Sequence, residues 1–254
     1  DKESNSLTKE NLFIIGAGPS GIELACKLSD LYAHKFNIQI IEKSREILSK
    51  NKVFNREEAE KALKKRDIKI LFNTTVDEIT ENEIQIIDQS CKKNKLVHSG
   101  IIWTAGVKPN LPRIKNDVFK SFGKLVINEY LQMKEFNNVF ALGDISTLEG
   151  AEPLPKTAQV AMQQGKHAAS NLNLLINKKE LLPFEFKDNG EMISLGLGEA
   201  SISALGITLS GKFAFELRRL IYASKMPIFE KSFKSAASWL IDKKSFFSKI
   251  IINS

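Results

Sequence analysis

Cysteine is scarce in this chain of 254 residues, which contains only Cys26 and Cys91. The two lie far apart and form no CxxC or CxxxxC pair. The sequence therefore argues against a redox-active disulfide and against a cysteine metal site, and we expect no bound metal. So few cysteines also suit a reducing compartment.

Long apolar runs are absent as well. No stretch of about 18 apolar residues occurs, so the sequence predicts no membrane-spanning helix. The polar start, DKESNSLTKEN, is not a signal peptide. The chain does not begin with Met, and we therefore expect a processed chain or one piece of a longer protein.

Acidic residues are fewer than basic ones: the chain has 30 Asp and Glu and 37 Lys and Arg, which gives a formal net charge of +7. This balance is compatible with nucleic acid, an anionic membrane or an anionic cofactor, and does not choose among them. No known nucleic-acid-binding module accompanies the basic residues, so we expect no nucleic-acid partner. Hydrophobic residues make up 43% and charged residues 26%, as in ordinary globular proteins.

The sequence does contain an alternation of apolar strands and helices typical of an α/β fold. A strand at Leu12–Ile15, a helix from Pro19 to about Ala33 and a strand at Ile38–Glu42 form a βαβ pattern with strands covered on both faces. Up to about residue 110 we also expect a helix at 56–66, strands at 68–72 and 101–104, and an antiparallel meander within 76–88.

A second segment follows residue 110. There we expect strands at 125–128 and 139–142, a helix from about Thr157 to Leu175, two strands within 184–197, and a helical, basic region from Leu205 onward.

Between the first strand and helix stands GAGPSG, in which Gly16, Gly18 and Gly21 match GxGxxG. In such a motif the first glycine permits a tight turn, the second lets the backbone approach a pyrophosphate, and the third lets the helix pack against the strand. The helix N-terminus then offers N–H groups to the phosphates. Glu42 ends the next strand, where a carboxylate would bind a ribose hydroxyl. The combination predicts a dinucleotide site.

The same acid bears on which dinucleotide is bound. Glu42 would repel the 2′-phosphate of NADP, whereas Lys43 and Arg45 could tolerate one. We favour NADH. Glu23 follows in what the sequence indicates to be the first helical turn, where its ordinary role would be to complement the helix dipole.

Three later stretches suit either a cofactor or ordinary structure. Gly106 ends the strand WTAG, where a cofactor could approach the backbone or where the chain could simply turn. Asp144 ends VFALGD and could bind ribityl hydroxyls or cap the next segment. Gln159 and Gln163 lie on one helix face and could meet a quinone or flavin carbonyl, or water.

The order of these motifs resembles that of the type II NADH dehydrogenases, single-subunit flavoenzymes that pass electrons from NADH to a membrane quinone. GAGPSGIELA, WTAGVKPN, VFALGD and LPKTAQVAMQQG carry the resemblance. It implies a Rossmann-like NAD(P)-binding domain, the C-terminal part of a discontinuous FAD-binding domain, and C-terminal amphipathic helices. FAD and NADH are the cofactors that it implies.

The resemblance also implies roles for individual residues. The NADH site would comprise Gly16, Gly18, Pro19, Ser20, Gly21 and Glu42, with Ala105 and Gly106 bordering the nicotinamide. The FAD site would comprise Gly143, Asp144, Thr157, Ala158 and Gln159. Gln159 and Gln163 would line the quinone pocket, and Glu23 would lie near the nicotinamide and quinone and could assist quinone protonation.

Two departures from the family pattern stand out. Lys156 replaces a proline before Thr157, which could loosen that turn. GxGxxG occurs once, whereas the family has a further copy that binds the ADP half of FAD, so we expect a truncated form. The expected domains are a polar segment (1–10), an NADH-binding domain (11–110), part of an FAD-binding domain (111–200) and a membrane-associating region (201–254).

The C-terminal region is basic and rich in aromatic residues, and Phe229, Phe233, Ala236 and Leu240 follow helical spacing. Such a helix could lie on an anionic membrane surface or dock on the protein's own core. The resemblance favours the membrane, because the quinone dissolves in lipid. We expect a peripheral protein on the cytoplasmic side of a plasma or thylakoid membrane, and a homodimer is conceivable.

The leading hypothesis is thus an NADH:quinone oxidoreductase that pumps no protons. A ferredoxin reductase or NADH oxidase is a second hypothesis. A non-catalytic NADH-binding fragment is a third.

Overall fold

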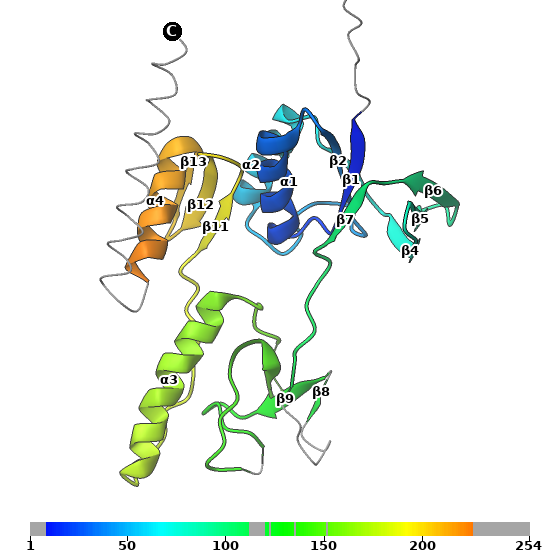
Figure 1. Cartoon of the computed structure of the whole chain (residues 1–254). Coiled ribbons are helices and arrows are strands. Elements are labelled where there is room, and N and C mark those ends of the chain that lie inside the picture. The colour runs from blue at the N-terminus through cyan, green and yellow to red at the C-terminus, as the bar shows by residue number, and fades with distance from the viewer. Residues whose placement is uncertain (1–8, 112–119, 122, 135, 151, 226–254) are drawn as a thin grey trace, which may run out of the picture. The chain divides into compact units, whose positions relative to one another are not determined.

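The computed structural model describes residues 9–111, 120–121, 123–134, 136–150 and 152–225 (Figure 1). The chain divides into two compact units. Unit 1 comprises Asp1–Ala105 and Asn189–Ser254, and unit 2 comprises Gly106–Asp188. The sequence grouped residues 189–200 with the second segment, whereas in the structure they belong to unit 1.

Unit 1 is built on a parallel sheet with the strand order β3-β2-β1-β7. Its strands are β1 (Glu10–Ile15), β2 (Phe36–Ile41), β3 (Lys69–Leu71) and β7 (Gly100–Trp103). The chain leaves β1 on one side towards β2 and returns on its other side as β7. The carboxyl ends of β1 and β7 therefore flank the point where the strand order reverses, which is where open α/β sheets bind ligands.

Both faces of this sheet are covered, which explains the apolar runs in its strands. Ile14 and Ile40 pack in the core beneath helices α1 (Pro19–Tyr32) and α2 (Val53–Lys65). Phe13 and Ile15 face the opposite core, which Ile84 shares. That core is completed by the antiparallel sheet of β4 (Thr75–Ile79), β5 (Glu83–Ile87) and β6 (Lys93–Val97).

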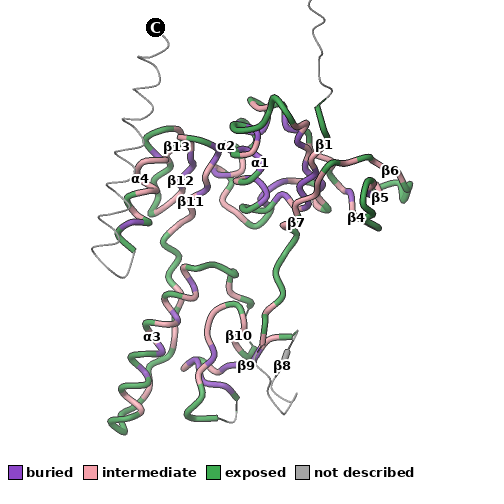
Figure 2. Tube along the Cα trace, in the orientation of Figure 1, coloured by how far each residue is buried: buried purple, intermediate pink, exposed green. Residues whose placement is uncertain are grey.

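A second antiparallel sheet packs against α1 and α2 within unit 1. It consists of β11 (Glu191–Ser194), β12 (Ala200–Ala204) and β13 (Ile207–Ser210), followed by α4 (Gly211–Ser224). Ile193 and Leu195 enter the same core as α1 and α2. Figure 2 shows buried residues gathered around α1 and β1 and along β11 and β12.

Unit 2 holds a small mixed sheet and one long helix. The sheet order is β10-β9-β8, from β10 (Ser146–Leu148), β9 (Lys124–Ile127) and β8 (Lys120–Ser121). The helix is α3 (Ala158–Ile176), and a short 3-10 turn, η2, spans Gly143–Ile145. The hydrophobic core of unit 2 includes Leu125, Ile127 and Ala168.

Three predicted elements are wrong. The segment 139–142 is not a strand, because it pairs with the chain near Leu131 only through an isolated bridge, that of Phe140 with Gln132. Residues 184–197 hold one strand, β11, rather than two. A hairpin precedes the helix after Leu205, since Leu205 and Gly206 both have positive φ (51° and 78°) and form a two-residue turn.

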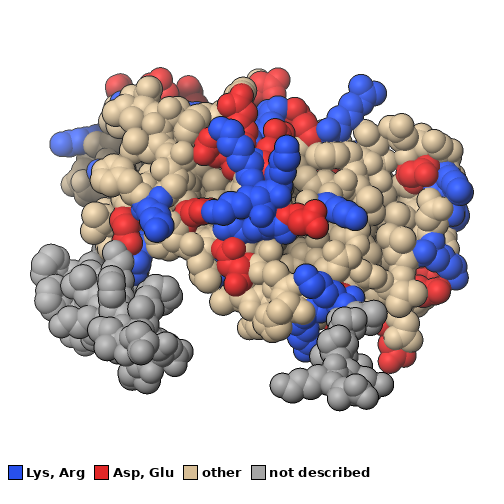
Figure 3. Space-filling view, turned by 90° about the horizontal axis from the view of Figure 1, so that it is seen from above, with Lys and Arg blue, Asp and Glu red and all other residues tan. Residues whose placement is uncertain are grey.

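Among the described residues, every helix is too short or too polar to cross a membrane. The predicted amphipathic segment with Phe229, Phe233, Ala236 and Leu240 lies outside the described residues. On the face seen in Figure 3, basic and acidic side chains are interspersed.

Candidate functional site

The loop between β1 and α1 depends on its three glycines in different ways. Gly16 has φ of 103°, a conformation that favours glycine. A Cβ on Gly21 would lie 1.9 Å from the carbonyl oxygen of Gly16, so the helix and the loop approach too closely for any side chain. A Cβ on Gly18 would meet no atom of the described residues within 4 Å, which leaves open space beside the start of α1.

Thr104, which was not among the predicted site residues, anchors this loop from the end of β7. Its Oγ1 donates hydrogen bonds to the carbonyl oxygens of Ile15 (2.8 Å) and Gly16 (3.1 Å). Thr104 directly follows β7, which pairs with β1, and no local sequence pattern marks this contact. Ala105 and Gly106 follow and are exposed, and Gly106 has φ of 91°.

Glu42 directly follows β2 and lies next to the glycine loop. Its Oε2 accepts the Ala17 N–H at 2.6 Å and its Oε1 accepts the Ser44 N–H at 2.7 Å. The carboxylate is half-buried and thus fixed on both sides by backbone. A carboxylate has about four acceptor positions, so a ribose hydroxyl can still donate to it.

Pro19 and Ser20 form the exposed start of α1, with Pro19 in the first turn. Together, the helix N-terminus, the space beside Gly18 and the acceptor at Glu42 fit a dinucleotide with an unmodified ribose 2′-hydroxyl.

The Glu42→Gln variant is expected to bind NADH about tenfold more weakly and to discriminate less against NADPH. The variant retains one amide oxygen but loses the charge that strengthens both backbone hydrogen bonds and opposes a 2′-phosphate. Dissociation constants for both nucleotides, measured by titration, check this. An unchanged ratio between the two nucleotides would contradict the assignment of Glu42 to the ribose.

Glu23 does not lie in the first turn of α1, which contains no acidic residue, so the expected dipole-complementing role is wrong. Its Oε1 instead accepts hydrogen bonds from the Ser194 N–H (2.9 Å) and from Nη2 of Arg218 (3.0 Å). Glu23 therefore connects α1 with β11 and α4, a pairing across nearly the whole chain that no local sequence pattern indicates.

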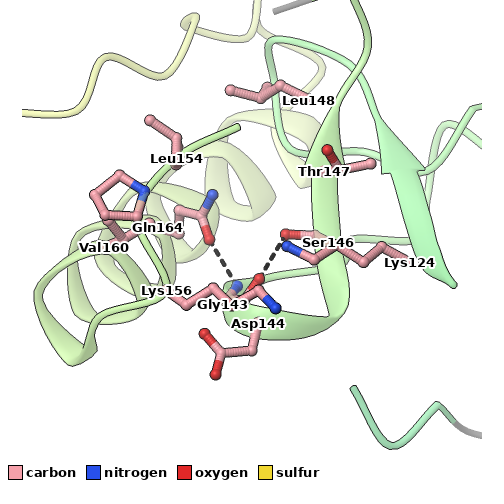
Figure 4. Close-up of a pocket in the computed structure, with 11 residues that line it drawn as sticks. Lys124, Gly143, Asp144, Ser146, Thr147, Leu148, Leu154, Lys156, Val160 and Gln164 are labelled. Carbon is pink, nitrogen blue, oxygen red and sulfur yellow. Dashed lines mark hydrogen bonds between the residues drawn. The ribbon is translucent and has the colours of Figure 1, made fainter. Parts of the chain in front are cut away.

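In unit 2, the Gly143–Asp144 turn lies beside the start of α3 (Figure 4). Gly143, with φ of 69°, donates its N–H to Oε1 of Gln164 at 2.6 Å. Ser146 Oγ donates to the Gly143 carbonyl at 3.0 Å. The Asp144 side chain points away from these bonds and is exposed.

A small pocket of about 20 Å³ lies at this turn. Its polar lining includes Asp144, Lys124 and Lys156, and its apolar lining includes Leu154 and Val160. Thr157 caps α3, since its Oγ1 accepts the Val160 N–H at 3.3 Å, and Ala158 is the first helical residue. An exposed carboxylate and a helix N-terminus close together offer an acceptor for hydroxyl groups and donors for a phosphate, both of which a flavin nucleotide carries.

Of the two predicted glutamines, Gln163 is already engaged. Its Nε2 donates to the Lys187 carbonyl at 2.7 Å and its Oε1 accepts the Lys187 N–H at 3.0 Å. Gln159, one turn earlier, is half-buried. The neighbouring Gln164, which was not among the predicted site residues, is the glutamine that contacts the Gly143–Asp144 turn.

Comparisons with known proteins identify a family and several relatives of this chain. The pyridine nucleotide-disulphide oxidoreductase family matches residues 1–165. Demethylphylloquinone reductase NdbB of Synechocystis sp. is 34% identical over 242 residues, which are 94% of this chain and 59% of that protein. Type II NADH:quinone oxidoreductase of Staphylococcus epidermidis is 27% identical over 226 residues, covering 83% and 56% of the two chains.

Among solved structures, NDH2 from Plasmodium falciparum in complex with NADH superposes with a TM-score of 0.73 at 15% identity, over 88% of this chain and 63% of that one. At this identity the likeness shows the fold alone. The chain spans rather more than half the length of these relatives. The predicted resemblance and the predicted fold class are both confirmed.

Proposed function

Because the chain belongs to the pyridine nucleotide-disulphide oxidoreductase family, we propose that this protein oxidises NADH and passes the electrons through FAD to a quinone. The glycine loop beside Glu42 carries the NADH part of the proposal. The quinone part is supported by the names of relatives that are 34% and 27% identical, both of which are quinone reductases.

FAD, when bound, supplies the step that accepts a hydride from NADH and releases electrons to an acceptor. The chain's own residues bind and orient. Gly16, Gly18 and Gly21 shape the loop for the pyrophosphate, and Glu42 holds the ribose. Asp144 and the start of α3 would hold the FAD ribityl chain and ring.

We assign Gln159 and Gln163 to the quinone and Glu23 to its protonation. The geometry adds a condition to each assignment. Gln163 must exchange its two hydrogen bonds with Lys187 for those of a quinone carbonyl. Glu23 must act while its Oε1 receives two donors, the Ser194 N–H and Arg218.

The acceptor is proposed to lie in a membrane, with the protein bound to an anionic surface. In the described part of the C-terminal region, α4 exposes Phe213, Leu220 and Tyr222 together with the basic residue Lys212, and the exposed Lys225 directly follows the helix. Apolar and basic side chains on one helix suit a lipid headgroup boundary. The cytoplasmic side, the plasma or thylakoid membrane and a homodimer stay predictions.

The experiment compares electron acceptors. The full-length protein is purified with FAD, and NADH oxidation is followed with a short-chain quinone, with oxygen and with ferredoxin. The quinone is expected to give the highest rate. A flavin-loaded protein that reduces ferredoxin or oxygen but not quinone would favour the reductase or oxidase alternative, and a protein that binds NADH without oxidising it would favour the non-catalytic one.

A further inference from the structure

Gln164 is the most deeply buried side chain of the pocket in unit 2, with 2% of its surface exposed. It lies on the face of α3 opposite the exposed Met162, one residue after the predicted quinone ligand Gln163. A buried amide costs free energy unless it is hydrogen-bonded. Here Oε1 receives the Gly143 N–H at 2.6 Å, which also fixes the orientation of the amide.

This contact holds one side of the Gly143–Asp144 turn, and Ser146 holds the other. Gln164 accepts the Gly143 N–H, and the Ser146 hydroxyl donates to the Gly143 carbonyl at 3.0 Å (Figure 4). Both peptide groups of Gly143 are thereby fixed at a positive φ of 69°, although glycine, which has no Cβ, could adopt many other conformations. The next residue along is Asp144, whose side chain is exposed.

We propose that Gln164 is a positioning residue that fixes the Asp144 carboxylate relative to the N-terminus of α3 and so sets the affinity for FAD. This inference rests on the proposed function. Asp144 and the start of α3 belong to separate elements, η2 and α3, and the hydrogen bond between Gly143 and Gln164 joins these two elements directly. A cofactor that contacts both elements binds best when their separation is fixed beforehand.

Packing alone does not account for a glutamine at this position. An apolar side chain of equal length would fill the same space but would leave the Gly143 N–H without its acceptor. The Gln164→Met variant makes this change with little change in volume. It is expected to raise the dissociation constant for FAD about tenfold, the factor for loss of one well-placed hydrogen bond, and to alter the visible circular dichroism of the bound flavin.

Asn171 offers a matched control on the same helix. It is also buried, with 0% exposed, and its amide bonds the backbone of Leu182 (2.9 and 3.0 Å) and Tyr130 (3.3 Å) at a distance from the pocket lining. Asn171→Leu is expected to lower the melting temperature but to leave the dissociation constant for FAD within about twofold of the wild type. Equal weakening of FAD binding by both variants would overturn the proposal.

Ser146→Ala is a second variant that spares α3 entirely. It removes the hydroxyl that donates to the Gly143 carbonyl, on a side chain that is 6% exposed. It tests the proposal even if Gln164→Met does not fold. It is expected to raise the dissociation constant about threefold, because the loosened turn still keeps its contact with Gln164. FAD affinity unchanged in a folded Ser146→Ala protein would count against the positioning role.

A double-mutant cycle separates action through Asp144 from general loosening. In an Asp144→Ala background, Gln164→Met is expected to change the FAD dissociation constant less than about twofold, since the carboxylate that it positions is gone. The same tenfold effect in both backgrounds overturns the inference alone. A full-length wild-type protein that binds no FAD overturns the proposed function and the inference with it.

Discussion

The Gly21→Ala variant is expected to lose about 3 kcal/mol of unfolding free energy and at least about tenfold in NADH affinity. The added methyl group would lie 1.9 Å from the Gly16 carbonyl oxygen, and 3.0 Å from Thr104 Oγ1. A backbone carbonyl cannot rotate away as the end of a side chain can. The start of α1 would therefore have to move away from the glycine loop, which disrupts the NADH site. Chemical denaturation and NADH titration measure the two effects.

Gly18→Ala is the control for this variant, because it makes the same chemical change three residues earlier. Gly18 has φ of −74°, which any residue adopts, and open space where a Cβ would go. Its unfolding free energy should stay within about 1 kcal/mol of the wild type. NADH binding should nevertheless weaken about tenfold, because the methyl group would occupy the approach of the pyrophosphate. If Gly18→Ala bound NADH normally, the NADH phosphates could not lie against this loop, and the assignment would be wrong.

The Arg66→Met variant is expected to cost about 2 kcal/mol of unfolding free energy, since it removes a largely buried cation that bonds two partly exposed carboxylates. The Arg66 side chain is 8% exposed. It bonds Asp30 through Nε (2.7 Å) and Nη2 (3.0 Å), and Nη2 also reaches Glu199 at 3.2 Å. This cluster ties α1 and the end of α2 to the turn between β11 and β12.

Lys65→Met provides the comparison for Arg66. Lys65 forms an ion pair with the same Glu199 at 2.5 Å, but its side chain is 64% exposed. An exposed pair contributes at most about 1 kcal/mol, so this variant should be nearly as stable as the wild type. Equal losses in the two variants, measured by urea denaturation, would show that burial of the Arg66 cluster is not what stabilises it.

The cost of Arg66→Met should also depend on pH. Burial opposes ionisation of Asp30, but hydrogen bonds from Arg66 and the Leu197 N–H outweigh it, so the pKa of Asp30 lies below its usual value. A lowered pKa contributes stability above the unfolded pKa of about 4, and this stability is lost as the pH falls through the folded pKa. The difference between wild type and variant should therefore shrink between about pH 7 and pH 3.

The first βαβ unit could be predicted from sequence because its signals are local. Phe13, Ile14 and Ile15 form an apolar run since both sheet faces are covered, and the glycines mark a turn whose geometry other residues cannot adopt. Glu42 stands at the end of the next apolar run, so the order of strand, loop, helix and strand was enough to place the acid beside the loop.

Residues that act through long-range contacts could not be predicted in this way. Glu23 meets Arg218, 195 positions away, and Thr104 meets Gly16, 88 positions away. Nothing local in the sequence marks either pair. Gln164 differs from Gln163 only in its position around α3, and the helix periodicity alone did not show which of the two faces the Gly143–Asp144 turn.

Electron flow from NADH through FAD to a quinone is tested most directly by following the flavin absorbance of the full-length protein without oxygen. NADH is added first, and a short-chain quinone is added after the excess NADH has been removed. The absorbance of oxidised flavin is expected to fall with NADH and to recover with the quinone. Flavin that NADH does not reduce, or reduced flavin that the quinone does not reoxidise, would contradict the proposed function.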